Sequence, residues 1–443
     1  MKIQLSFSSA KHNPIKQLPK SDMLSSLAPL ADPTLLNKQL EIQASRFRDA
    51  IAARDYLQAY DAVQGVLVLV PEHPTARIDL AFTELRLERY QDAYQHYLEA
   101  LQLYPDHEMN YHIYDGLVEA CIALNLKHEQ QKYGALSLLH KQRQVENNHV
   151  LTFPQQRPEF DPSQPLENII AFSLSSADPR YCESAILNVR YAREIFPEWT
   201  CRFYIDETVP IDVQLRLKIA GAQIETVAPS FKAYPVDFWR FLVMGDAKVK
   251  FFLLRDVNAL LSRKERAAVN DWLDSEFWFH QMRDYGTHTE LLLAAYLGGC
   301  YGPFKHITSI LQQYWHMHQE TQKRAHEWFF LRQVWSTISQ SLLTHDSQGY
   351  STASTAFPEY VAKSDYEKSP QFYVGADLST PIVEVQVHEE QVERVRWHLV
   401  DEQQHSVCAY DAFVAEGKIR MNLPRPYAEN LSTGHWKICL QGY

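Results

Sequence analysis

The amino-acid sequence predicts a multidomain protein in three parts: all-α helical repeats, then an α/β domain with a parallel sheet, then a small all-β sandwich. Three observations predict this division. A stretch near the N-terminus recurs at a fixed offset, strand-like and helix-like segments alternate through the middle, and runs of period two fill the C-terminal part. The length of 443 residues agrees, because a prior of about 150 residues per domain suggests about three domains.

The composition is that of a soluble globular protein, with 46% hydrophobic and 22% charged residues. The formal net charge of −11 argues against a general grip on nucleic acid, although a local basic patch stays open. The six cysteines form no C-x-x-C pair, so neither a zinc knuckle nor a disulfide framework is expected. The first residues lack the apolar core of a signal peptide, and no run of about 18 apolar residues occurs. We therefore expect no transmembrane segment and a cytoplasmic location.

Helical repeats are expected over residues 38–150, after an N-terminal extension of residues 1–37. DYLQAYDAVQGVLVLVPEHP aligns with RYQDAYQHYLEALQLYPDHE at an offset of 34 residues. The aligned pairs are Tyr56 with Tyr90, Ala59 with Ala93, Tyr60 with Tyr94, and Pro71 with Pro105. This period, with small Ala at the helix crossing and Pro past the second helix, resembles the tetratricopeptide repeat (TPR). A third, degenerate unit follows, in which Leu124 stands at the Tyr position.

Such repeats usually present a concave face to a peptide or partner protein, so we expect a protein partner here. The alternative is that the stack packs on the next domain or dimerises. The segment 151–168 carries four prolines without periodicity and is predicted to be an extended connector.

The α/β domain is expected over residues 169–350. IIAFSL (169–174), TCRFYID (200–206) and QIETVAP (223–229) read as strands separated by helical stretches. This alternation predicts a parallel sheet with crossover helices, in which ligands bind at the carboxyl ends of the strands. A fourth strand, FFLL, ends on Arg255 and Asp256. A carboxylate at a strand end suits Mg or Mn beside a ligand's phosphates, and the amide oxygen of Asn258 is a neutral second ligand.

The order of these elements resembles bacterial glycosyltransferases of the GT-A fold, in which an Arg-bearing helix precedes an apolar strand ending in an Asp-x-Asp motif. Five local motifs over residues 168–348 carry the resemblance: RDVNALLSRKERAAVNDWLDS, FHQMRDYGTHTE, YLGGCYG, WFFLRQVW and THDS. The resemblance implies a nucleotide-diphosphate sugar as donor, Mn or Mg, and a protein or surface-glycan acceptor. Two departures stand out: Asn258 replaces the second Asp, and His326-Glu327 replaces an Asp-Gln pair.

The resemblance and the residue chemistry together nominate candidate site residues. Metal ligands are Asp256, Asn258 and His345; donor-binding residues are Arg240, Arg255, Arg283, Gly298 and Gly299; acceptor-side catalytic residues are Asp284 and His288. Each has a structural alternative. An Arg can pair a structural carboxylate, Arg283 can pair Asp284, the glycines can form a plain turn, and His345 can be solvated or capping.

A polar linker over residues 351–372 precedes the predicted sandwich of residues 373–443, where runs such as IVEVQVH alternate with period two. Trp397 and Trp436 could stack on a carbohydrate, although a core position is the more frequent role of Trp. The module could also pack on the α/β domain or mediate assembly.

Two functions from different classes follow. The first is a metal-assisted glycosyltransferase acting on a protein or a glycan precursor. The second is a degenerate, inactive transferase that serves as a scaffold or adaptor for protein partners, which the departures at Asn258 and His326-Glu327 favour. A nucleic-acid-binding repeat protein is disfavoured by the acidic balance.

Overall fold

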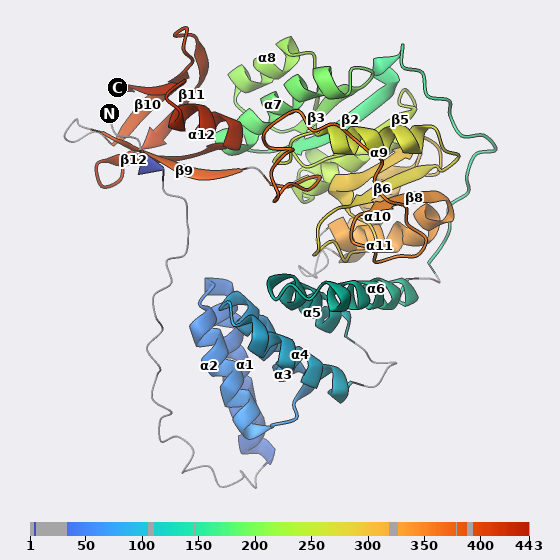
Figure 1. Ribbon diagram of the computed structural model, residues 1–443, viewed down its shortest axis with the longest axis vertical. Helices are drawn as coiled ribbons and strands as arrows, with labels where there is room; N and C mark the ends of the chain where they lie inside the picture. The colour runs from blue at the N-terminus through green and yellow to red at the C-terminus, as the bar shows by residue number, and fades with distance from the viewer. Residues whose placement is uncertain are drawn as a thin grey trace.

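The computed structural model describes residues 4–5, 33–104, 110–145, 148–318, 327–377, 379–387 and 393–442. The helical repeats form one body, and the α/β domain and the C-terminal β module lie side by side above it (Figure 1). Helices α5 and α6 lie between the first repeats and the α/β domain. Among the described residues, no helix has the length and apolar character needed to cross a bilayer. His326 lies outside the described residues.

The repeats consist of three helical hairpins. Their helices are α1 (Pro33–Ala53), α2 (Tyr56–Leu69), α3 (Pro74–Arg86), α4 (Tyr90–Leu103), α5 (Tyr111–Ala123) and α6 (Lys127–Arg143). Each hairpin turns on a residue with positive φ: Arg54 at 57°, Glu88 at 60° and Asn125 at 57°. Ala59 and Ala93 are fully buried, as expected for small residues where helices cross.

Two predicted boundaries of the repeats differ from the structure. The turn residues Glu88 and Asn125 are 37 positions apart, not 34, so the counterpart of Tyr90 in the third unit is Lys127. Leu124 instead caps the C-terminal end of α5. The alignment missed this because it assumed a constant period, whereas the third unit begins three residues late. Helix α1 also begins at Pro33, inside the predicted extension.

The third hairpin is docked on the α/β domain. Lys141 of α6 is fully buried and donates to both oxygens of Asp115, at 2.8 and 2.9 Å, and to the Thr289 carbonyl at 2.9 Å. Gln130 donates to the Tyr350 hydroxyl at 2.7 Å. Of the uses expected for the repeats, packing on the next domain is therefore realised by the third hairpin.

The α/β domain is built on a seven-stranded sheet in the order β4-β3-β2-β5-β7-β6-β8. Its strands are β2 (Asn168–Leu174), β3 (Thr200–Ile205), β4 (Gln223–Thr226), β5 (Phe251–Leu254), β6 (Phe279–Arg283), β7 (Leu297–Cys300) and β8 (Leu342–Asp346). The helices are η3 (Pro165–Glu167), α7 (Pro179–Ile195), α8 (Ile211–Ile219), η4 (Pro229–Phe231), η5 (Val236–Gly245), α9 (Arg263–Leu273), η6 (Ala294–Tyr296), α10 (Ile307–His318), α11 (Glu327–Ile338) and η8 (Ser339–Ser341).

The sheet is mixed rather than parallel throughout. Strands β2 to β5 pair in parallel, as predicted, but β7 is antiparallel to both of its neighbours. The connection from β6 to β7, residues 284–296, contains only the single turn η6 and no crossover helix of the kind that usually joins parallel strands. Between β2 and β5 the order of strands reverses, because β3 and β4 are added on one side of β2 and β5 on the other. Such a reversal is where open α/β sheets bind ligands.

The C-terminal module consists of two three-stranded antiparallel sheets, β1-β9-β12 and β11-β10-β13. Its elements are β1 (Gln4–Leu5), β9 (Ser379–Gln386), β10 (Arg394–Val400), β11 (Ser406–Phe413), β12 (Lys418–Pro424), α12 (Arg425–Ser432) and β13 (Lys437–Gly442). The all-β prediction missed α12, a two-turn helix after Pro424, and it missed β1, which comes from the other end of the chain. Trp397 lies in the core, 1% exposed, and stacks on Tyr410, so it cannot stack on a sugar.

The module is fixed to α7 through a buried carboxylate. Glu183 of α7 is fully buried and accepts hydrogen bonds from the hydroxyls of Tyr410 at 2.6 Å and Tyr427 at 3.1 Å. Arg216 of α8 forms a bidentate pair with the same carboxylate, with both distances 2.7 Å. The module is thus fixed to the α/β domain.

Candidate functional site

A pocket of about 350 Å³ lies at the carboxyl ends of β2 and β5, where the strand order reverses. The end of β2 and the loop after it, from Ser173 to Ser176, form one side of it. The other lining residues are Tyr181 of α7, Val236, Asp237 and Arg240 of η5, and the residues after β5, Asp256 to Asn258. The fold therefore brings three predicted residues together, Arg240, Asp256 and Asn258, at the place where ligands of such sheets bind.

The two charged residues at the end of β5 differ in exposure and in role. Asp256 has a side chain that is 48% exposed and faces the pocket. Arg255 is buried and is paired through Nε with the Glu265 carboxylate of α9. Its Nη1 donates to the carbonyls of Leu254 at 2.7 Å and Leu297 at 3.0 Å. Arg255 thus ties α9 to the strand ends, and the donor-binding role proposed for it gives way to its structural alternative.

Arg240 is the only Arg that lines this pocket among the described residues. It is 1% exposed and is held between two carboxylates, Asp256 on Nη1 and Glu327 of α11 on Nη2. Its Nη1 also donates to the Arg255 carbonyl at 3.1 Å, and its backbone N–H donates to Ser173 Oγ at 3.0 Å.

The charges in this ion triad perturb one another. Burial opposes the charge of Arg240, but Glu327 and Asp256 outweigh burial and raise the pKa of the guanidinium. Burial raises the pKa of Glu327 to about 7, although Arg240 acts in the opposite direction. Glu327 therefore changes charge near neutral pH, and it does so in contact with Arg240, which lines the pocket.

Asn258 contributes an unused acceptor. Its Oδ1 is buried and has no hydrogen-bond partner among the described residues. A buried amide oxygen without a partner is costly unless a ligand satisfies it. Asp256 and Asn258 together offer two hard oxygen ligands, which fits the way Mg²⁺ is held by one or two protein oxygens and substrate phosphates. Within the part of the chain that the structure describes, no three His, Cys, Asp or Glu side chains form a complete metal site.

The third predicted metal ligand is elsewhere. His345 lies on β8, and β7 and β6 separate that strand from β5, which at about 4.8 Å per strand places it about 14 Å away. Its ring nitrogens are within 2.8 Å of His280 Nε2 and 3.1 Å of the Asp271 carboxylate. The structure therefore does not bring His345 to Asp256; His345 is buried between His280 and the exposed Asp271 of α9.

The loop after β6 holds the predicted acceptor-side residues, and their polar atoms are engaged. Asp284 is buried, accepts from Lys264 Nζ at 2.6 Å and accepts from the Val374 N–H at 2.8 Å. Arg283 does not pair with it; its guanidinium donates to the carbonyls of His288 and Glu290. Arg283 therefore fixes the shape of the loop and is remote from the donor pocket.

His288 is a neutral side chain in this loop. Burial, together with the positive charge of Arg283, lowers its pKa to about 3. Its Nδ1 accepts from the backbone N–H groups of Asp284 at 3.2 Å and Tyr285 at 3.1 Å, which assigns the proton to Nε2. Its ring lies 4.7 Å from that of Tyr296, whose pKa is raised by burial and by the charge of Asp256. Tyr296 therefore lies against His288 of this loop and close enough to Asp256 to be affected by its charge.

The two predicted glycines are packing residues. Gly298 and Gly299 lie in the buried strand β7, where a Cβ would meet Leu253 at 2.9 Å and Phe252 at 2.5 Å. Side chains of the core, not a sugar, therefore require the absence of a side chain here.

Sequence reasoning missed Glu327 and Asp237 as site residues. Asp237 lies three residues before Arg240 on the same short helix, so the spacing could have predicted that both side chains face the same pocket. Glu327 was noted only as a departure from a motif, and it reaches the pocket because α11 packs beside η5.

No model of a known protein family matches the chain, and no curated protein matches it. Solved structures resemble parts of it. The TPR2B-domain:pHsp70 complex of yeast Sti1 is 14% identical with a TM-score of 0.23, over 24% of this chain and 82% of that one. The Arabidopsis OM64 TPR domain is 18% identical with a TM-score of 0.22, over 24% and 84%. An O-GlcNAc transferase mutant of Thermobaculum terrenum is 14% identical with a TM-score of 0.25, over 49% and 46%. The chain thus spans less than half of that transferase, and similarity at this level does not decide an activity.

Proposed function

We propose that this protein is a glycosyltransferase of the GT-A type that uses a nucleotide-diphosphate sugar. The observation that carries the proposal is the pocket at the strand reversal, in which Arg240, Asp256 and Asn258 meet. The reversal of strand order between β2 and β5 supports the proposal, because open α/β sheets bind ligands at such a position.

The pocket suits a diphosphate leaving group. Departure of a nucleoside diphosphate develops negative charge on phosphate oxygens, and a preorganised cation stabilises that charge in a partly desolvated site. Arg240 is such a cation, because β2 and the Arg255 carbonyl hold it in place independently of the two carboxylates. In the proposal its guanidinium binds phosphate oxygens in place of the Asp256 carboxylate.

A divalent ion, Mn or Mg, fits the remaining ligands. Asp256 and Asn258 would hold it, and the ion would neutralise phosphate charge as a Lewis acid. Asp256 would then bind the ion in place of Arg240, and Arg240 would bind phosphate oxygens in place of Asp256. Each of the two side chains would therefore keep a partner of opposite charge. Asn258 Oδ1 would gain the partner that it lacks.

The acceptor side of the proposal involves the loop after β6. Because Asp284 already accepts from Lys264 and Val374, it positions the loop rather than takes a proton. His288 carries its proton on Nε2 and can donate a hydrogen bond to an acceptor oxygen, but it is not a base in this tautomer. We propose that a protein acceptor reaches this loop by way of the repeats.

Thermal stability of the full chain with UDP, GDP, CMP and dTDP, each with and without Mn, tests the donor site. A ligand at 100 times its dissociation constant adds about 2.7 kcal/mol to the free energy of unfolding. We expect a metal-dependent shift with one nucleotide, lost in Asp256→Ala and kept in Asp365→Ala, whose side chain is fully exposed. No shift with any nucleotide would overturn the proposal.

A second function, an inactive transferase that acts as a scaffold, is favoured by the closed triad of Arg240, Asp256 and Glu327. In this triad the charge of Arg240 is already compensated by carboxylates without a ligand, and Asn258 supplies one negative charge fewer than an acid would. A stable complex with a protein partner, together with no nucleotide-dependent shift, would favour the scaffold.

A further inference from the structure

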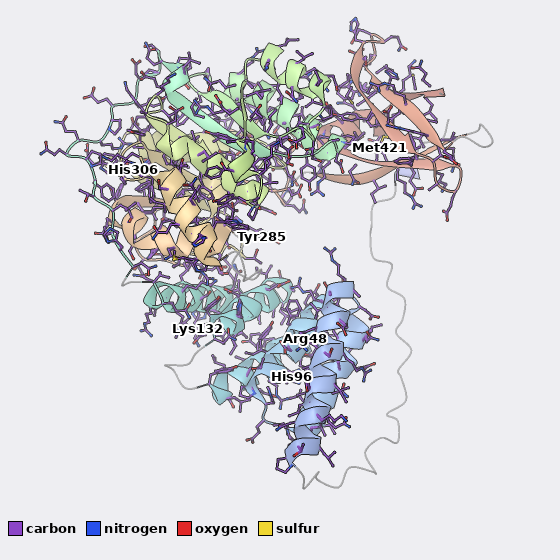
Figure 2. The ribbon with its side chains drawn as sticks, turned by 180° about the vertical axis from the view of Figure 1, so that it is seen from behind. Arg48, His96, Lys132, Tyr285, His306 and Met421 are labelled. Atoms are coloured by element: carbon purple, nitrogen blue, oxygen red, sulfur yellow. The ribbon has the colours of Figure 1, made fainter. Side chains whose placement is uncertain are left out.

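A second cavity lies between the repeats and the α/β domain. It has a volume of about 550 Å³, and helices α1, α3 and α5 line it together with Thr287, Thr289 and Glu290 from the loop after β6. Its apolar part includes Ile78 and Phe82, the latter 36% exposed. Figure 2 shows Tyr285, which belongs to the same loop, at the edge of the α/β domain that faces the repeats. We call this cavity the repeat groove.

The repeat groove is lined by four carboxylates and by no Lys or Arg among the described residues. They are Asp79, Asp115, Glu119 and Glu290. Three of them are paired with cations that are not part of the lining: Lys141 with Asp115 at 2.8 Å, Arg86 with Glu119, and Arg332 with Glu290 at 2.8 Å.

Asp79 differs from the other three carboxylates. It is half-buried, and its carboxylate makes no hydrogen bond or ion pair with any residue that the structure describes. Burial raises its pKa to about 6. A charged, partly desolvated acid in an open groove is stabilised by a cation and destabilised by an anion.

The shape of the groove is firmly built. Tyr97 of α4 packs against Gly116 of α5 so closely that a Cβ there would meet the phenol ring at 2.1 Å. The buried Lys141 joins Glu290 of the loop to Asp115 of α5, and Arg332, which pairs with Glu290, donates to the Tyr111 hydroxyl of α5 at 2.8 Å. The cavity is therefore a formed surface between two docked parts.

We propose that the repeat groove binds a cationic, partly apolar peptide segment, with a Lys or Arg side chain on Asp79 and an apolar side chain against Ile78 and Phe82. The evidence is charge complementarity together with the mixed lining. The same lining excludes a peptide that ends in acidic residues. That the bound segment is the acceptor rests on the proposed transferase function; the binding itself does not.

The position of the groove gives such binding a consequence. Thr287 and Thr289 flank His288, whose ring lies against Tyr296 beside the donor pocket. A peptide in the groove would touch the loop that carries the acceptor-side residues. Residues a short distance along the peptide would then be presented to the transferase pocket, which favours modification close to a basic sequence.

Binding of three fluorescein-labelled 12-residue peptides to the full chain tests this inference. One alternates Lys with Leu, one alternates Glu with Leu, and one alternates Ser with Leu. We expect the Lys peptide to bind at least tenfold more tightly than the other two, and we expect added salt to weaken it. Asp79→Asn should weaken the Lys peptide about tenfold, while Asp61→Asn, an exposed Asp outside the groove on α2, should not.

Equal binding of the three peptides, or a Lys peptide insensitive to Asp79→Asn and to Asp79→Lys, would overturn the inference. Thermal unfolding of each variant shows whether it is folded. Peptide binding should persist in Asp256→Ala. A protein that binds the peptide but no nucleotide would therefore refute only the proposed transferase function. A protein that binds a nucleotide but not the peptide would refute only the proposed peptide binding in the repeat groove.

Discussion

Replacing the buried Lys141 by Met tests how the repeats are attached to the α/β domain. Lys141 is fully buried in α6, and its ammonium lies within 3.1 Å of Asp115, the Thr289 carbonyl and Glu290. Met has a similar length and no charge, so the substitution removes the interactions while keeping most of the packing volume.

The expected cost follows from what is left behind. Removing one partner of a buried ion pair costs about 3–5 kcal/mol, because the other charge stays buried without compensation. Here the remaining carboxylates keep some support, since Ser137 donates to Asp115 at 2.6 Å and Arg332 pairs with Glu290. We therefore expect a loss near the lower limit, about 3 kcal/mol.

Urea unfolding followed by circular dichroism, with hydrogen exchange of residues 284–290, measures the effect. Lys132→Met is the matched control, because Lys132 is exposed on the same helix (Figure 2). The double variant Lys141→Met/Asp115→Asn should lose at least about 1 kcal/mol less than the sum of the single variants, because no unpaired Asp115 charge remains. If Lys141→Met unfolds within about 0.5 kcal/mol of Lys132→Met, the docking by this ion network is refuted.

Three further outcomes are expected. Lowering the pH from 8 to 6 protonates Glu327, whose pKa is about 7, and frees Arg240 from one carboxylate. The ratio of pyrophosphate affinity at pH 6 to that at pH 8, measured by calorimetry, should therefore be larger in the unchanged protein than in Glu327→Gln. Equal ratios in the two proteins contradict this. The pKa of Asp79 is raised from 3.8 to about 6, so ionisation of this side chain lowers the stability of the protein as the pH rises from 3.8 to about 6. Asp79→Asn should therefore be more stable at pH 7 by about 1–2 kcal/mol in urea unfolding. An unchanged unfolding midpoint would contradict this expectation. Tyr410→Phe removes a 2.6 Å hydrogen bond to the buried Glu183 and should cost about 1.5–3 kcal/mol by the same measurement, with Tyr410→Leu costing more through lost packing; a neutral Phe variant would show that the bond contributes nothing net.

The parts of the fold that the sequence predicted depend on local patterns. Ala59 and Ala93 mark helix crossings within single hairpins, and strands β2 and β3 are short apolar runs between helices. The antiparallel direction of β7 could not be predicted in this way, because it depends on which strands it pairs with across the sheet. The pairing of β1 with β9 is more distant still, since it joins the two ends of the chain.

A site residue could be predicted from the sequence only where its helix or strand determines the direction of its side chain. Asp256 follows a strand whose end fixes its exposure, and Arg240 lies on the helix before it. Arg255 and Arg283 have the same chemistry and equally suggestive neighbours, yet both side chains are directed into the core and bind carbonyl groups there. Glu327 enters the pocket from α11, so only the packing of that helix against η5 reveals it.

A substitution at Asn258 can distinguish the proposed transferase from the proposed scaffold. Adding a negative charge at this position tests metal binding more directly than removing the charge of Asp256 does. In Asn258→Asp the orphaned Oδ1 becomes part of a second carboxylate beside Asp256, which Arg240 alone cannot neutralise. The empty protein should lose stability through repulsion between the two acids, and it should gain affinity for Mn, because each added carboxylate strengthens a hard-cation site. Thermal unfolding with and without Mn measures both effects, with Asp256→Ala/Asn258→Asp as the control that keeps a single acid. Loss of stability without any gain from Mn would show that the two oxygens do not converge on one ion, and the metal would then have no part in the function of this pocket.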